Sequence, residues 1–296
     1  MEGVSATARW TAAARAVETR RPDALFTDDL AEALAGPEGF ARFERYDNPG
    51  TTEFLAIRTR WLDEVIGRSA RPQVVLVAAG LDTRSVRLDW ASGTVLYELD
   101  QAGLMEWKEK RLAELDAVHR CDRRGIGTDL TGPWEETLRS AGWDPSVPTL
   151  WIAEGLLFYL PEPDARTLLE RLASCSAPGS VLAGDLIAHQ SMISEFTQEG
   201  LARLRADGCP WLWGTDRPAE FLNSCGWTPG DLRLPGEDGA SFGRWPWPPL
   251  PRDTLGFPMN HLFTCCLQRG GPVPQGGEET RHGAAGCSAG SVGGGR

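Results

Sequence analysis

The stretch that decides the fold reads VVLVAAGLDTR over residues 74–84, and TVLYELD follows it over residues 94–100. Each begins as a short apolar run rich in β-branched residues, which is typical of a strand buried on both faces. The first run ends in Gly80 and the second in Asp100. A strand, a glycine turn, a helix and a second strand with a terminal acid form the half-unit with which open α/β sheets bind a nucleoside. The sequence therefore predicts a mostly parallel sheet with a nucleoside site at its carboxyl edge.

Two further acids follow predicted strands and belong to the same edge. The run TLWIA, residues 149–153, leads to Glu154, and a weaker strand over residues 121–128 leads to Asp129. A carboxylate after a buried strand is costly without a partner, so a functional role for Glu154 is expected. Asp129 has an alternative, since it can merely cap the helix that follows.

The glycine turn differs from the dinucleotide fingerprint. The second and third glycines of Gly-x-Gly-x-x-Gly are missing, and Asp82 stands where a phosphate would be repelled. A nucleoside without phosphates fits better, and S-adenosylmethionine is the common one. An NAD-dependent oxidoreductase is accordingly disfavoured. A non-catalytic nucleoside-binding module of the same fold stays open as an alternative.

Composition excludes several other classes. The 296 residues carry a formal net charge of −11, which argues against nucleic acid or an anionic membrane as partner. No apolar stretch approaches ~20 residues, and the N-terminus shows no signal peptide. Seven scattered cysteines without a Cys-x-x-Cys pair, and only four histidines, predict no metal site and reduced thiols in a cytoplasmic protein.

Periodicity predicts the order of elements and three regions. The regions are a helical cap over residues 1–55, a sheet domain over residues 56–269 with an acceptor-site insertion at 190–252, and a disordered glycine-rich tail over residues 270–296. Helices are expected over residues 6–20, 28–35, 51–67, 101–118, 134–141, 164–175 and 218–225. Strands are expected over residues 74–79, 94–99, 121–128, 149–153, 180–186, 227–234 and 260–268.

These residues together resemble a known family. The runs that contain Gly80, Asp100 and Glu154 are similar to the leucine carboxyl methyltransferases, a group of class I S-adenosylmethionine-dependent methyltransferases. Residues 22–28 are similar to the entry of their helical cap. The sequence FGRWP, residues 242–246, looks more like the bacterial branch, which includes O-methyltransferases of natural-product pathways. The resemblance covers roughly residues 5–268 and implies an α/β fold, a Rossmann-like seven-stranded methyltransferase sheet under an N-terminal helical cap.

The resemblance also implies which residues bind the cofactor, S-adenosyl-L-methionine, and its product S-adenosylhomocysteine. In this family an arginine before the first strand binds the methionine carboxylate, and a basic residue of the first helix often assists. The candidates are Arg15, Arg58, Ala78, Gly80, Asp100, Gln101, Asp129, Leu130 and Glu154. Within this set, Asp100 would take the ribose, Asp129 with Leu130 would flank the adenine, and Glu154 would lie near the amino group. Tyr159 would lie beside the methyl donor.

The acceptor is expected to be a small molecule or a peptide that is methylated on oxygen. A carboxylate is ionised at neutral pH and needs no general base, whereas a phenol, with a reference pKa of about 10, benefits from one. A carboxylate is therefore preferred. His189, after the fifth predicted strand, is the best candidate for a base if the acceptor is a hydroxyl. The tryptophan pairs at 211/213 and 245/247 either line an acceptor pocket or pack the cap onto the sheet.

Overall fold

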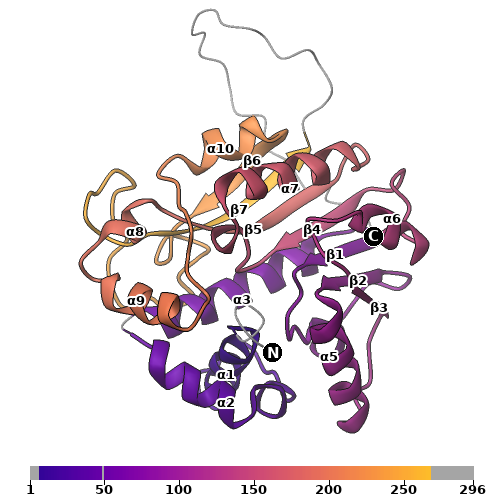
Figure 1. Ribbon diagram of the computed structural model, residues 1–296, viewed down its shortest axis with the longest axis horizontal. Coiled ribbons are helices and arrows are strands. Elements are labelled where there is room, and N and C mark those ends of the chain that lie inside the picture. The colour runs from indigo at the N-terminus through magenta and orange to yellow at the C-terminus, as the bar shows by residue number, and fades with distance from the viewer. Residues whose placement is uncertain (1–6, 49, 268–296) are drawn as a thin grey trace, which may run out of the picture.

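The computed structural model describes residues 7–48 and 50–267, which form one sheet with helices on both faces (Figure 1). The sheet has seven strands in the order β3-β2-β1-β4-β5-β7-β6. Strands β1 to β5 pair in parallel, while β7 is antiparallel to both β5 and β6. The predicted Rossmann-like, mostly parallel methyltransferase sheet is thus confirmed. The strands are β1 (Gln73–Val77), β2 (Val95–Asp100), β3 (Asp122–Gly127), β4 (Thr149–Ala153), β5 (Val181–Ile187), β6 (Trp227–Arg233) and β7 (Asn260–Leu267).

Alternation along the strands divides the core between two faces. Val75 and Val77 of β1 join one cluster with helices α6 (Trp134–Ser140), α7 (Glu162–Ser174) and α10 (Pro218–Ser224). Val74 and Leu76 point to the other face and pack against α3 (Thr51–Arg68). Helix α5 (Ala102–Glu114) follows β2 and packs beside β3. Because both faces are covered, the central strands are apolar throughout, as their sequences predict.

The N-terminal helices form the predicted cap. Helix α1 (Thr7–Thr19) packs along α2 (Ala31–Tyr46), and both lie below the sheet in Figure 1. The sequence predicts that Gly36 and the proline after it end the second helix. Gly36 does leave the helical conformation, with φ +59°, but the helix starts again and continues to Tyr46. Proline is well tolerated in a first helical turn, so a kink replaces the expected end.

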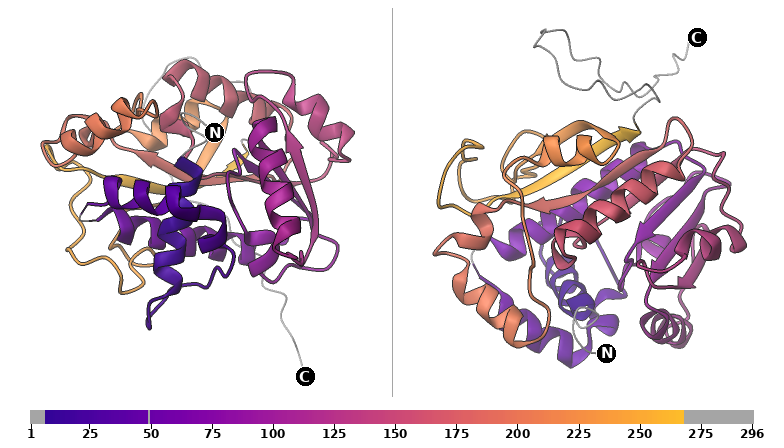
Figure 2. Two further views of the ribbon diagram at one scale, coloured as in Figure 1. Left: turned by 60° about the horizontal axis from the view of Figure 1, so that its bottom comes forward. Right: turned by 45° about the horizontal axis from the view of Figure 1, so that its top comes forward.

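A second covering layer comes from two segments, one before β6 and one after it. It contains α8 (Gln190–Ile193), α9 (Gln198–Ala206) and the long loop that joins β6 to β7. Figure 2 shows this layer at the same end of the sheet as the cap helices. The short helix α4 (Arg84–Arg87) and a 3₁₀ turn, Leu157–Tyr159, complete the described elements.

Several expectations about the chain meet the structure here. Helix α3 runs through position 55, so the proposed border between cap and sheet domain falls inside one helix. The predicted tail, residues 270–296, lies outside the described residues. The described helices include none long and apolar enough to span a membrane. Among the described residues, five cysteines have free thiols: Cys121, Cys175, Cys209, Cys225 and Cys265.

Candidate functional site

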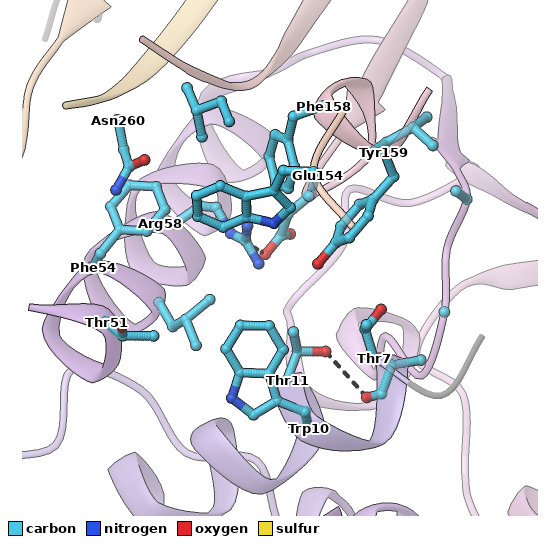
Figure 3. Close-up of a pocket in the computed structure, with 18 of the residues that line it drawn as sticks. Thr7, Trp10, Thr11, Thr51, Phe54, Arg58, Glu154, Phe158, Tyr159 and Asn260 are labelled. Carbon is cyan, nitrogen blue, oxygen red and sulfur yellow. Dashed lines mark hydrogen bonds and ion pairs between the residues drawn. The ribbon is translucent and has the colours of Figure 1, made fainter. Parts of the chain in front are cut away.

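A cavity of about 950 Å³ opens at the carboxyl edge of the sheet, between the strands, the cap and the insertion. That volume is at the upper end for small-molecule sites, so it has room for two small molecules side by side. The strand ends of β1, β2 and β4 line one side, and α1, α3, α9 and the loop before β7 line the other. Figure 3 shows Arg58, Glu154 and Tyr159 around this space, with the rings of Trp10 and Phe54 opposite and beside them.

The turn after β1 brings two predicted residues together. The amide of Gly80 donates a hydrogen bond to Asp100 Oδ2 at 2.7 Å, and the amide of Gln101 donates to Oδ1 at 2.7 Å. Gly80 has φ +52° and Ala78 has φ +59°, a left-handed conformation that costs a non-glycine residue about 1–2 kcal/mol. Burial raises the pKa of Asp100, and the two amides oppose that rise. The turn therefore fixes a carboxylate at the cavity wall with lone pairs left for a ligand.

Arg58 and Glu154 form an ion pair in the wall. Arg58 Nε donates to Glu154 Oε1 at 3.0 Å, and Nη1 donates to Asp185 Oδ2 at 3.0 Å. The arginine side chain is only 7% exposed. Burial lowers the pKa of Arg58, but Asp185 and Glu154 more than offset that effect. The third guanidinium nitrogen, Nη2, makes no hydrogen bond with the described residues and is available to a ligand anion.

Arg84 extends this pair into a network. Its guanidinium binds Glu154 Oε2 at 2.7 Å, Asp82 Oδ2 at 2.5 Å and Asp63 Oδ1 at 2.7 Å, and Arg87 also binds Asp63. Burial raises the pKa of Asp82, but the positive charge of Arg84 outweighs burial, and the pKa falls below its ordinary value to about 2. Arg58, Arg84 and Arg87 face four carboxylates, those of Asp63, Asp82, Glu154 and Asp185, which leaves a net charge of −1.

The remaining cofactor candidates, Arg15, Asp129 and Leu130, differ in the contacts that they make. Arg15 binds Asp28 Oδ2 at 2.8 Å and donates to the carbonyl of Leu81 at 2.6 Å, so it braces the turn after Gly80. Asp129 and Leu130 line the cavity. Asp129 accepts hydrogen bonds from the backbone amide and the hydroxyl of Thr131. These two bonds lower the pKa of the Asp129 carboxyl. The acid that was expected to be a possible helix cap thus closes a local turn at the cavity wall.

The two proposed catalytic residues differ in position. Tyr159 lies in the cavity wall, where burial raises the pKa of its hydroxyl to about 12. His189 is exposed at the start of α8 and is not among the residues that line the cavity. Of the tryptophans, Trp211, Trp245 and Trp247 line the cavity, whereas Trp213 packs on Phe221 in the core. Three of the four tryptophans thus line the cavity, and the fourth packs against helix α10.

Sequence reasoning missed part of the ionic network. Asp63, Arg84, Arg87 and Asp185 had no assigned role. A signal existed for Asp185, since a charged residue inside the apolar run of β5 needs a buried partner. Arg84 gave no such signal, because its partners are distant in sequence at Asp63 and Glu154.

The predicted nucleoside fits these residues. Asp100 is held by two amides and lines the cavity as a hydrogen-bond acceptor, and Arg58 lines it with Nη2 as a donor. The net charge of −1 favours a ligand with cationic groups on this side. An amino acid joined to a nucleoside through a sulfonium carries all three features: hydroxyls, a carboxylate and positive charge.

Comparisons with known proteins agree with this fit. The profile of the leucine carboxyl methyltransferase family matches residues 8–173. A protein of Mycobacterium sp. (strain KMS) is 39% identical over 248 residues, which cover 76% of this chain and 82% of that protein. A protein of Streptomyces coelicolor is 37% identical over 284 residues, covering 82% of this chain and 92% of that protein. Both bear the name "Putative S-adenosyl-L-methionine-dependent methyltransferase".

A solved structure shares the fold. A DUF574 family protein from Streptomyces avermitilis superposes with a TM-score of 0.63 at 12% sequence identity, covering 88% of this chain and 97% of that chain. At that identity the likeness concerns the fold alone.

Proposed function

Because this chain belongs to the leucine carboxyl methyltransferase family, as an S-adenosylmethionine-dependent methyltransferase, we propose that it methylates an oxygen atom of a small acceptor. The observation that carries the proposal is a single cavity that is lined by Arg58, Asp100 and Glu154 in one part and by largely apolar side chains in the rest, which we treat as a second space. The cap helices and the insertion enclose that second space, so we assign them to the acceptor.

Each cofactor candidate receives a proposed role. Arg58 Nη2 binds the methionine carboxylate, Glu154 accepts from the amino group, and Asp100 with Gln101 holds the ribose. Ala78 and Gly80 let the backbone approach the nucleoside, Asp129 and Leu130 flank the adenine, and Arg15 holds the turn in place. When bound, S-adenosylmethionine supplies a methyl group activated by a positively charged sulfur. The residues then act by orienting the acceptor oxygen and by excluding water.

The acceptor oxygen is proposed to arrive ionised. Tyr159 lies in the cavity with a pKa of about 12, so at neutral pH its hydroxyl is a hydrogen-bond donor and not a base. His189, the other candidate, is exposed outside the cavity lining. A carboxylate meets this requirement directly, and a phenol meets it only after losing its proton. We therefore propose a carboxylate first and a phenolic hydroxyl second.

Calorimetric titration tests the cofactor before any acceptor is known. S-adenosylhomocysteine and NAD are titrated into separate samples of one preparation. Micromolar binding of S-adenosylhomocysteine with no binding of NAD supports the proposal and rejects the oxidoreductase alternative. No binding of S-adenosylhomocysteine would contradict it. A gain of one methyl mass on any acceptor then rejects the alternative of a non-catalytic binding module.

A further inference from the structure

The acceptor side of the cavity has an unusual lining, which we call the acceptor chamber. Its wall includes Trp10, Phe54, Phe158, Tyr159, Trp211 and Asn260. Every charged residue that lines the cavity already has a hydrogen-bond partner in the wall. These residues are Arg15, Arg58, Asp82, Arg84, Asp100, Asp129 and Glu154. The described lining of the acceptor chamber thus offers no unpaired charged side chain to a bound molecule.

The polar side chains of the acceptor chamber are mostly occupied as well. Thr51 bonds to Asn48, the hydroxyl of Ser191 bonds to the carbonyl of Met259, and Thr197 bonds to backbone carbonyls. Three side-chain groups have no hydrogen-bond partner among the described residues. They are the buried indole N–H groups of Trp10 and Trp211 and the amide of Asn260, which Figure 3 places at the cavity.

The small number of free hydrogen-bonding groups in the acceptor chamber favours an apolar acceptor over a peptide. A peptide brings an N–H and a C=O for each residue, and leaving one such group buried without a partner costs about 1–3 kcal/mol. The acceptor chamber offers too few free polar groups for several peptide units. A molecule whose body is apolar loses nothing by entering it and gains from burial.

The mouth of the cavity continues the apolar lining outward. Phe196 and Phe257 stack with their ring centroids 5.4 Å apart, yet they are 60% and 42% exposed. Trp247, 44% exposed, lines the same cavity. We call these three residues the aromatic rim. Large exposed aromatic side chains at the opening of a pocket mark a surface that buries an apolar ligand.

We propose that the acceptor is a lipophilic small molecule with one polar group, the oxygen that is methylated, and an apolar body held by the aromatic rim. This inference rests on the proposed function for the reacting end. The apolar body extends from the acceptor chamber past Phe196 and Phe257, and a peptide acceptor is excluded. Asn260, Trp10 or Trp211 offers the hydrogen bond that this one polar group of the acceptor can accept.

A fluorescent ligand tests the aromatic rim without a methyl-transfer assay. The uncharged naphthalene dye prodan brightens and shifts to the blue in apolar sites, and it is titrated into the full chain with and without S-adenosylhomocysteine. We expect saturable binding that is weakened at least about tenfold in the double variant Phe196→Ser/Phe257→Ser. Ile193→Ser is the matched control. Ile193 is 57% exposed on α8 and does not line the cavity, so its variant keeps the wild-type affinity.

Competition identifies the class of acceptor. We expect 2-naphthoate to displace the dye, and an N-acetylated tripeptide that ends in a leucine carboxylate to fail at tenfold higher concentration. Equal displacement by the peptide, no saturable dye binding, or unchanged affinity in the double variant would overturn the inference. Calorimetry with S-adenosylhomocysteine tests the proposed function separately. Loss of cofactor binding with the dye pattern intact would refute methyl transfer but leave the lipophilic site in place.

Discussion

At the scale of single residues, Arg58 pairs with two carboxylates and, as proposed, also binds the cofactor. Arg58→Lys keeps the positive charge for Glu154 and Asp185 but cannot reproduce the planar fork that leaves Nη2 free. We expect the affinity for S-adenosylhomocysteine to fall by roughly 2–3 kcal/mol, measured by calorimetry. Arg60→Ala is the control, because Arg60 lies two positions away on α3, is 44% exposed and pairs with Glu64. Equal affinities for the wild type and Arg58→Lys would remove Arg58 from the proposed site.

A second prediction concerns His261, whose side chain is buried in β7 with both ring nitrogens unpartnered. Burial lowers its pKa to about 4. The unfolded chain, with a histidine pKa of about 6.5, therefore binds a proton before the folded chain does. The stability that comes from the neutral ring is complete above pH ~6.5 and is lost as pH falls toward 4. Between pH 7 and pH 5 the loss amounts to about 2 kcal/mol.

Urea unfolding at the two pH values measures this effect. His261→Leu cannot bind a proton in either state, so its stability should fall by about 2 kcal/mol less than that of the wild type over the same interval. An identical loss in the wild type and the variant would place the pH dependence elsewhere.

The site residues that could be predicted from the sequence are those that follow the ends of strands. Alternation and apolar runs predict where a strand stops, and Asp100 and Glu154 follow such stops. The partners of Arg84 were not predictable in this way, because they depend on which strands and helices become neighbours. Asp63 comes from α3 and Glu154 from the end of β4, and only the assembled sheet brings both to Arg84.

At the scale of elements, helix α5 is anchored to the sheet by a buried charge pair. Lys108 Nζ lies 2.6 Å from Glu98 Oε2, both side chains are fully buried, and Arg123 also binds Glu98. Lys108→Met should destabilise the protein by about 3–5 kcal/mol, because it leaves a carboxylate without one of its cations in the core. Adding Glu98→Gln removes that charge and should recover much of the loss. Chemical denaturation of both variants checks the pair, and no recovery in the double variant would contradict a role for charge.

Helices and strands with a strong period were predictable, and those without one were not. The predicted helix over residues 51–67 is observed as Thr51–Arg68, and the strand over residues 149–153 is observed with the same bounds. Helix α9 was not expected, because only Leu201 and Leu204 of its residues are buried, too few to give an apolar stripe.

At the scale of the whole molecule, ligand binding should be visible as thermal stability. A ligand that binds the folded chain alone adds about 2.7 kcal/mol at a concentration one hundred times its Kd. For a domain of this size, that corresponds to a rise in Tm of roughly 5 °C or more. We expect this shift with S-adenosylhomocysteine and none with NAD at equal concentration. A scanning calorimeter gives the result, and equal shifts for both ligands would contradict a site that lacks the dinucleotide fingerprint.

The order of the sheet lies beyond local sequence patterns. A glycine turn and a terminal acid predict that β1 and β2 are parallel neighbours, as observed. The antiparallel insertion of β7 between β5 and β6 depends on contacts between distant segments, and the sequence analysis did not predict it. The sequence predicted that a cap and an insertion would cover the cavity, but it did not predict most of the side chains that line the cavity.

Helix α3 has a consequence for the order and strength of binding. One rigid helix presents Thr51 and Phe54 to the acceptor chamber and Arg58 to the cofactor side. Any displacement of this helix by one ligand changes the wall that the other ligand meets. Thermodynamic reciprocity then requires that each ligand alter the affinity of the other by the same factor. If both ligands contact this helix as proposed, and binding of either one displaces it, substrate recognition and cofactor recognition form one coupled equilibrium, described by a single interaction constant.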